Sequence, residues 1–331
     1  MERLLSRGPS ETTWKSAFMS TPGPETGRSA ALLAVKGAFM GAADTVPGVS
    51  GGTIALITGI YEDLLAAVKS VSARSVKQLL SLDLKGAMAE VHVRFLVCIF
   101  CGIGIAVLSL ARVMTYLIDN HPVPTWSLFF GLIAASLWVV GQKVNRWSAA
   151  SVAAFFTGAV SAYFIVGMVP AQTPETFSFV FLSGMLAICA MILPGISGAF
   201  ILLILGKYEF ILGALENPLL ASNLAVLGIF ALGCAFGLAG FSRVLKFMLE
   251  KFHNPALACL TGLMLGSLRK IWPWKTPVRM EKVHGELMVI SEKNVLPDSF
   301  WPGAAVPVLL MAAGFVLVLL LARFTRSVPS R

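Results

Sequence analysis

Six long stretches of this chain contain no charged side chain, and they limit the folds that it can adopt. The stretches cover residues 95–111, 120–142, 147–174, 176–206, 217–242 and 302–322. A helix of about 20 apolar residues crosses the hydrocarbon core of a bilayer, and most of these stretches are longer. Only 13% of the 331 residues are charged, and no large soluble domain fits between the stretches. We therefore predict an all-α polytopic membrane protein.

Two of the apolar stretches share an unusual interruption. The segment "PGVSGGTIALITGIYEDLL" from Pro47 is matched by "PGISGAFILLILGKYEFIL" from Pro194, which begins 147 residues later. Of the 29 positions from Gly37 to Leu65, 13 are identical in the two copies, and weaker similarity continues at an offset of 131. Chance matches between apolar segments are mostly Leu and Ile. The shared P-G-x-S-G and G-x-Y-E patterns therefore indicate an internal duplication.

The duplication divides the chain into two repeats and their connections. Each repeat is expected to hold a re-entrant helical hairpin with P-G-x-S-G at its tip, followed by two spans, as in some transporters. The hairpins are expected at about 31–68 and 178–213, and an extra amphipathic surface helix at about 73–90. The parts are a tail at 1–30, repeat 1 at 31–142, a linking span at 143–177, repeat 2 at 178–270, and a loop, final span and tail at 271–331.

The distribution of Lys and Arg predicts how the chain is oriented. The N-terminal tail, which lacks the apolar core of a signal peptide, and the loop after the first hairpin are basic, whereas "DNHPVP" and "PAQTPET" carry no cation. If cations mark the cytoplasmic side, the hairpins enter from opposite faces, the repeats are inverted and both termini are cytoplasmic. If the broken segments instead cross completely, the repeats are parallel. The 269–300 loop disagrees with the inverted topology, because it should be outside yet carries Arg269, Lys270, Lys275, Arg279, Lys282 and Lys293.

The interruptions themselves are candidate anion sites. Non-helical backbone at membrane depth is tolerated only where protein or water satisfies its polar groups. The helix after each break starts near Ser50 or Ser197, and the N–H groups at a helix start suit a phosphate. The alternative is that P-G-x-S-G is only a tight turn for helix packing. The candidate phosphate ligands in the two tips are Gly48, Ser50, Gly51, Gly52, Thr53, Gly195, Ser197 and Gly198.

Charged residues inside membrane segments are costly, so each is a functional candidate. Asp44 lies inside the first hairpin, where it either has a function in proton coupling or gating, or caps the break. Glu62 and Glu209 are duplicated, and they either accept protons or hold the hairpin ends in place. Arg112 and Arg243 are also duplicated. Arg suits bidentate phosphate contact, unless these two side chains only extend to the membrane surface.

Other function classes find little support in the sequence. The net charge of +9 is carried largely by short loops, so membrane topology explains it better than nucleic acid does. The four histidines show no metal-ligand spacing, and the five cysteines lie in apolar segments, where thiols usually pack. An intramembrane lipid phosphatase would need a nucleophile and a base, and no convincing pair is present. We expect no catalytic residue, no metal and no cofactor.

Three segments resemble the bacterial polyprenyl-phosphate transporter family, PopT. They are "GAADTVPGVSGGTIALITGIYEDLL", "LPGISGAFILLILGKYE" and "GSLRKIW", and the resemblance covers about 31–323. The second copy departs from the first where Gly52 and Thr53 become Ala199 and Phe200, which questions whether the two half-sites are equivalent.

The resemblance implies a flippase that returns undecaprenyl phosphate to the cytoplasmic leaflet of the bacterial inner membrane, for recycling in cell-envelope synthesis. Its partners would be the polyprenyl phosphate lipid, the bilayer and, in a homo-oligomer, further copies of the chain. The alternative is a secondary transporter of a small anion or other ion that uses the same hairpins.

Overall fold

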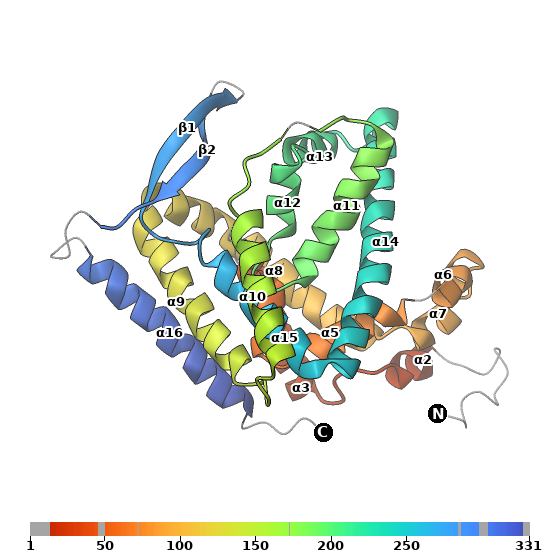
Figure 1. The fold of residues 1–331 in the computed structure, drawn as a ribbon. Helices are drawn as coiled ribbons and strands as arrows, with labels where there is room; N and C mark the ends of the chain where they lie inside the picture. Colours follow the sequence, from red (N-terminus) through yellow and green to blue (C-terminus); the bar gives the residue numbers. More distant parts are fainter. Residues whose placement is uncertain are drawn as a thin grey trace.

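Helices make up most of the protein in the computed structural model (Figure 1). The structure describes residues 14–45, 50–71, 73–171, 173–283, 286–297 and 304–326. Four of the described helices are long and apolar enough to cross a membrane: α8 (Val93–Asn120), α9 (Pro122–Gly141), α14 (Ala221–Lys251) and α16 (Ala305–Arg326). Two shorter apolar helices are α10 (Ala149–Ile165) and α11 (Phe177–Ile192). The predicted multi-pass helical membrane protein is confirmed.

Both interrupted segments fold as a helix, a break and two short helices that meet at a sharp angle. The first consists of α3 (Gly27–Asp44), α4 (Gly51–Ile57) and α5 (Tyr61–Ser70), and the second of α11, α12 (Gly198–Ile204) and α13 (Tyr208–Glu216). The angle is 117° between α4 and α5, and 108° between α12 and α13. The bends contain Gly59 and Gly206, whose φ values of +75° and +61° suit glycine. These shapes are consistent with the predicted re-entrant hairpins.

The ends of the short helices are held by hydrogen bonds from other segments. The last carbonyls of a helix have no hydrogen-bond partner within the helix. At the end of α4, two lysine side chains donate hydrogen bonds to these carbonyls. Lys36 Nζ donates to the Thr58 carbonyl at 2.9 Å, and Lys143 Nζ donates to the Leu56 carbonyl at 2.8 Å. At the end of α12, the backbone N–H of residue 171 and the hydroxyl of residue 173 donate to the last carbonyls. These bonds allow the chain to bend without leaving its carbonyls unsatisfied.

Glycines at matching positions pack the two repeats in the same way. Gly102 of α8 lies so close to the α3 backbone at Ala34 that a Cβ atom would overlap it. Its counterpart, Gly233 of α14, lies equally close to the α11 backbone at Phe181. Ala34 and Phe181 are themselves 147 residues apart, the offset of the duplicated hairpins. The duplication therefore extends from the sequence to the packing of α3 on α8 and of α11 on α14.

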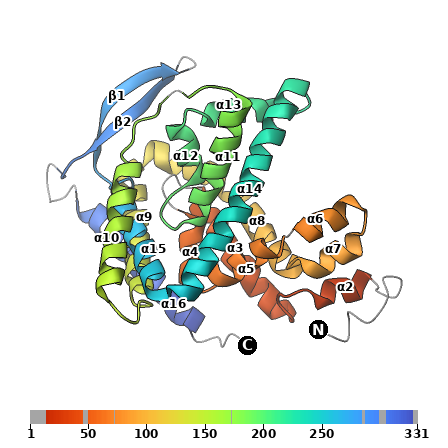
Figure 2. The ribbon, with the colours of Figure 1, turned by 45° about the vertical axis from the view of Figure 1, so that its right-hand side comes forward.

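The linking and final spans show the same kind of match. Gly131 of α9 packs against the α16 backbone at Met311, and Gly262 of α15 (His253–Ser267) packs against the α10 backbone at Phe155. Each of these helices therefore packs on a partner distant in the sequence, and Figure 2 shows α10 beside α15. The sequence comparison left both spans outside the repeats, whereas the packing makes α10 and α16 a further matching pair.

Two expectations about the N-terminal tail and the segment after the first hairpin need refinement. The surface helix expected at 73–90 is two helices, α6 (Ala73–Leu80) and α7 (Leu84–Glu90). They are separated by Leu82, with φ of +60°, and by Asp83, whose carboxylate accepts a hydrogen bond from Gly86 N–H and so caps α7. Part of the expected tail also forms a helix, α2 (Trp14–Ser20), which packs against α7.

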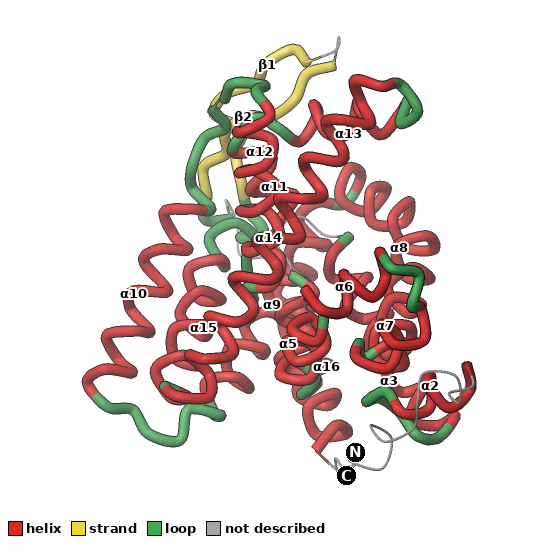
Figure 3. Tube along the Cα trace, turned by 90° about the vertical axis from the view of Figure 1, so that its right-hand side faces the viewer, coloured by secondary structure: helices red, strands yellow, loops and turns green. Residues whose placement is uncertain are grey.

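The prediction of an all-α chain is wrong for the 269–300 loop. This loop contains an antiparallel hairpin of β1 (Lys275–Val283) and β2 (Glu286–Asn294). Figure 3 shows the two strands extending beyond one end of the helices. The strands carry seven charged residues, which made the segment look like a polar loop in the sequence.

The two ends of the molecule differ in what they carry. The β-hairpin and α13 lie at one end, whereas α2, α5 and the last turn of α16 lie toward the other (Figures 1 and 3). The main hydrophobic core lies between these ends and contains residues from both hairpins, among them Tyr61, Leu65 and Ile196. The core therefore joins the two broken segments.

Candidate functional site

The two broken segments contact each other through polar atoms. Ser50 Oγ donates to the Leu193 carbonyl at 3.2 Å, which links the first tip to the end of α11. In the opposite direction, the Gly195 N–H donates to Thr53 Oγ1 at 3.1 Å. Ser50 and Thr53 are each only 1% exposed. The duplicated motifs thus form one buried polar junction between the two hairpins.

Two further contacts at Ile192 strengthen this junction. The hydroxyl of Tyr61, which is 2% exposed, donates to the Ile192 carbonyl at 3.1 Å. Gly52 lies against the same carbonyl, and a Cβ atom at position 52 would be 2.7 Å from its oxygen. The counterpart Ala199 is exposed and faces no such constraint. This difference accounts for one of the two mismatches between the copies.

Asp44 occupies the place at the start of α4 where an anion would bind. Its Oδ1 accepts a hydrogen bond of 2.7 Å from Gly51 N–H, and the Gly52 N–H donates to Ser50 Oγ at 3.2 Å. A Cβ atom at Gly51 would lie 2.6 Å from Asp44 Oδ2, so the carboxylate is packed directly on this backbone. Because α4 has only seven residues, these individual N–H groups matter more than the helix dipole.

The second tip lacks an equivalent carboxylate. The position that matches Asp44 is Met191, which is 45% exposed. Ser197 is the N-cap residue of α12, and its side chain forms no capping hydrogen bond. Gly195, with φ of +88°, packs against Ser267 of α15, and Gly198 packs against the α11 backbone. The two tips therefore share a backbone shape but differ in the acceptors that surround it.

The other candidate residues lie apart from this junction. Gly48 is outside the described residues. Arg112 and Arg243 are exposed on α8 and α14, and Arg243 donates to the Ala239 carbonyl of its own helix. Among the described residues, no hydrogen bond links either arginine to the tips. Glu62 is exposed in the first turn of α5 and Glu209 in the first turn of α13.

Comparisons with known proteins address the same segments. A model of the family described as undecaprenyl phosphate translocase-like matches residues 40–288, which include both tips. The chain belongs to this family. A polyprenyl-phosphate transporter from Vibrio cholerae is 40% identical over 297 residues, covering 88% of this chain and 95% of that protein. A polyprenyl-phosphate transporter from Staphylococcus aureus is 30% identical over 256 residues, covering 72% of this chain and 85% of that protein. No solved structure matches the chain.

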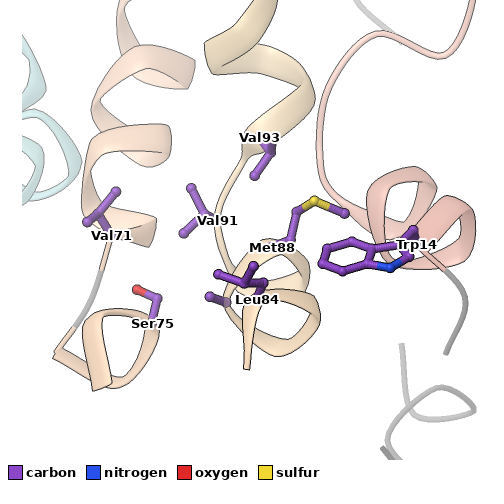
Figure 4. Close-up of a pocket in the computed structure, with 8 residues that line it drawn as sticks. Trp14, Val71, Ser75, Leu84, Met88, Val91 and Val93 are labelled. Atoms are coloured by element: carbon purple, nitrogen blue, oxygen red, sulfur yellow. The ribbon is translucent and has the colours of Figure 1, made fainter. Parts of the chain in front are cut away.

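Two cavities in this translocase-like protein offer different chemistry. One, of about 390 Å³, lies among α2, α6, α7 and the start of α8 and is lined almost wholly by apolar groups (Figure 4). Its lining residues are Trp14, Val71, Ser75, Leu84, Ala87, Met88, Val91 and Val93. The other, of about 720 Å³, lies beside the β-hairpin and is lined by several cations and by Glu209. Only the second cavity has the charge to receive a phosphate.

Sequence reasoning did not identify the cations of the larger cavity as a group. In the sequence they are an exception to the expected orientation of the 269–300 loop, and the signal that points to them is "GSLRKIW", through its two cations and its similarity to the family. No group of three or more His, Cys, Asp or Glu side chains is placed to hold a metal ion among the described residues.

Proposed function

We propose that this protein moves polyprenyl phosphate across the bacterial cytoplasmic membrane and returns undecaprenyl phosphate to the inner leaflet, without changing it chemically. The observation that carries the proposal is the buried polar junction between two broken hairpins in a multi-pass helical protein. Broken helices that meet within a membrane protein commonly form transport sites. Two relatives that match most of this chain are named polyprenyl-phosphate transporters, which supports the same substrate.

The two repeats are proposed to be inverted, with both termini in the cytoplasm. The angle between α4 and α5 is similar to that between α12 and α13, and α5 and α13 lie toward opposite ends of the molecule (Figure 1). The glycine contacts of α3 with α8 recur between α11 and α14. A pair of inverted hairpins lets each tip face the other from its own side of the membrane, which would allow access to alternate between the two sides.

The phosphate is proposed to bind at the junction, with Gly48, Ser50, Gly51, Gly52, Thr53, Gly195, Ser197 and Gly198 as its ligands. Backbone N–H groups and hydroxyls are suitable donors to phosphate oxygens. Asp44 Oδ1 already accepts from Gly51 N–H, so the carboxylate would have to withdraw before a phosphate could take its place. Arg112 and Arg243 are proposed to draw the headgroup toward the two membrane surfaces.

This competition gives Asp44 a role in proton coupling. Two anions close together in a medium of low dielectric constant repel each other strongly. Protonation of Asp44 would remove that repulsion and release Gly51 N–H for the substrate. A proton would then accompany the inward movement of the lipid phosphate, and Glu62 and Glu209 are proposed to accept protons at the two ends of the path.

A reconstituted assay tests the proposed function. The purified full-length chain is placed in liposomes that contain polyprenyl phosphate, and an impermeant phosphatase is added outside. We expect the protein to expose the inner-leaflet lipid to the enzyme, faster when the pH gradient favours proton flow with the lipid. Liposomes that take up inorganic phosphate, but leave polyprenyl phosphate where it was, would instead indicate a small-anion transporter.

A further inference from the structure

The cavity beside the β-hairpin has the volume of a binding site. Its volume is about 720 Å³, within the range of small-molecule pockets. It is lined by the end of α10 and the loop that follows, by α12 and the start of α13, by the end of α15 and by both strands of the β-hairpin. It is distinct from the polar junction, although Phe200 of α12 lines it. In this way the second hairpin contributes to both places.

Cationic side chains predominate among the charged groups of this cavity. Arg269, Lys270, Lys275 and Lys293 line it, together with the acids Glu209 and Glu292. Four cations against two acids leave an excess of positive charge. The cavity is partly shielded from water, where charges interact more strongly than in bulk solvent. An anion is therefore the ligand that this lining favours.

The guanidinium of Arg269 is held in a fixed position. It lies 4.3 Å from the ring centre of Tyr163, and its Nη1 donates to the Tyr163 carbonyl at 3.0 Å. Gly167 leaves room for it, since a Cβ atom there would overlap the guanidinium. A guanidinium carries five N–H donors in a rigid plane that matches a phosphate, and Tyr163 O takes one of them. Arg269 is thus positioned to bind an anion with little loss of freedom.

The two lysines are held by an acid and by aromatic rings. Lys270 Nζ lies 5.0 Å from the ring centre of Phe200, and Lys275 Nζ lies 4.5 Å from that of Trp126. Both approach Glu292, at 3.9 Å and 3.2 Å. Phe200 occupies the position that matches Thr53 of the first repeat. This mismatch therefore supplies the aromatic ring that Lys270 contacts in the second repeat.

The position of these cations is unusual for a membrane protein. In the proposed topology this end is external, and external loops are normally poor in Lys and Arg. A ligand-binding role explains the exception, because four of the six cations of the 269–300 loop line the cavity. The same cavity is bordered by exposed apolar residues, including Met168, Val169 and Leu203, beside which a hydrocarbon chain can lie.

We propose that this cavity is the outer-leaflet receptor site for the phosphate headgroup of an isoprenyl phosphate lipid. This inference rests on the proposed function, and it adds the place where the substrate is captured before it reaches the junction. Arg269 and Lys270 contact the phosphate, Lys275 adds charge behind them, and the isoprenoid chain leaves along the apolar border toward the membrane.

Binding of farnesyl phosphate to the full-length protein in nanodiscs tests the proposal. We expect Arg269→Gln and Lys270→Gln each to weaken binding at least tenfold, and Lys270→Arg to bind nearly as the wild type does. Glu292→Gln should tighten binding, because it removes a competing acid, an effect that a purely structural role would not produce. Lys251→Gln is the matched control, since Lys251 also lies over aromatic rings but does not line the cavity.

The outcomes separate this inference from the proposed function. The double variant Arg269→Gln, Lys270→Gln should bind farnesyl phosphate weakly while unfolding at the wild-type temperature. If it instead binds farnesyl phosphate as tightly as the wild type does, the receptor site is overturned, even if the wild type transports lipid. Equal binding of inorganic phosphate and farnesyl phosphate would overturn the receptor site too, since the isoprenyl chain would then contribute nothing to binding. Arginine-dependent binding of farnesyl phosphate supports the site, even if the liposome assay shows no transport and the proposed function fails.

Discussion

The amide of Gly195 donates a hydrogen bond of 3.1 Å to the hydroxyl of Thr53, and this bond joins two copies of a duplicated motif. The two residues are 142 positions apart in the chain. The bond is asymmetric, because the residue that matches Thr53 in the second copy is Phe200. An ancestral symmetry is thus retained in the backbone, while the side chains have taken different roles in the two halves.

Replacement of Thr53 by valine should destabilise the protein. Valine keeps the shape of threonine but removes the acceptor, so the buried Gly195 N–H loses its partner at a cost of about 1–3 kcal/mol. The unfolding temperature in detergent should therefore fall. Thr157→Val is the control, since Thr157 is exposed and donates its hydroxyl hydrogen bond to the Ala153 carbonyl of its own helix. Equal unfolding temperatures for the two variants would contradict the importance of this bond.

Much of the fold followed from the sequence because its signals were local. Uncharged stretches gave the spans, and the repeated P-G-x-S-G gave the two breaks. The match between α10 and α16 was missed, because it rests on packing positions such as Gly158 and Gly314 within otherwise different apolar sequences. A glycine that permits close helix approach looks the same in sequence as one that does not.

The candidate site was harder to predict, because it depends on which segments meet. Sequence symmetry suggested that both tips take part, but it could not show Thr53 bonded to Gly195. It also grouped Arg112 and Arg243 with the tips, whereas both are exposed on long helices. The cations from 269 onward come together only when the β-hairpin folds back over the end of α15, an arrangement that no local pattern announces.

Substitutions of Asp44 should separate its two suggested roles. Asn keeps an oxygen that can accept from Gly51 N–H but cannot be protonated as a carboxylate can. We expect Asp44→Asn to keep nearly the wild-type stability and to lose the dependence of lipid transport on a pH gradient. Asp44→Ala should also lose about 1 kcal/mol of stability, since it removes the cap. An Asn variant that still responds to the gradient would leave Asp44 with the capping role alone.

Glycine-to-alanine pairs within one helix test the duplicated packing. Gly102→Ala and Gly233→Ala should each cost about 1–3 kcal/mol, because the new methyl group overlaps the backbone of the neighbouring helix. Gly104→Ala and Gly228→Ala are the matched controls, with open space at the Cβ position. They should be neutral or stabilising by up to about 1 kcal/mol, since alanine favours helix. Thermal unfolding in detergent compares the four variants, and similar losses in all of them would refute the packing.

Single cysteines at the two ends test the inverted topology. Leu296, which is 74% exposed beyond β2, should lie outside the cell, whereas Lys69, exposed near the end of α5, should lie in the cytoplasm. In intact cells, a membrane-impermeant maleimide should label Leu296→Cys and leave Lys69→Cys unmodified until the cells are opened. The wild-type chain measures the background from its own cysteines. Labelling of both positions in intact cells, or of Lys69→Cys alone, would exclude the proposed orientation.

The charge state of Lys275 tests the electrostatics of the larger cavity. Burial lowers the pKa of its ammonium group from the usual 10.5, Glu292 opposes that shift and Lys270 adds to it. Glu292→Gln should therefore lower the pKa of Lys275 further, and Lys270→Gln should raise it. Because the folded-state pKa lies below the unfolded one, this lysine destabilises the fold below its folded-state pKa, and the penalty disappears as pH rises through the unfolded value.

Lysine signals in NMR spectra of ¹³C-methylated protein can measure these shifts. Methylation keeps the positive charge, and Lys275→Arg identifies the signal that belongs to Lys275. In the wild type this signal should titrate below those of exposed lysines, and phosphate-bearing lipid should move its pKa upward, because an added anion stabilises the ammonium form. A Lys275 signal that titrates with the exposed lysines, and ignores both the Glu292→Gln substitution and the lipid, would show that the cavity does not concentrate charge as the geometry requires.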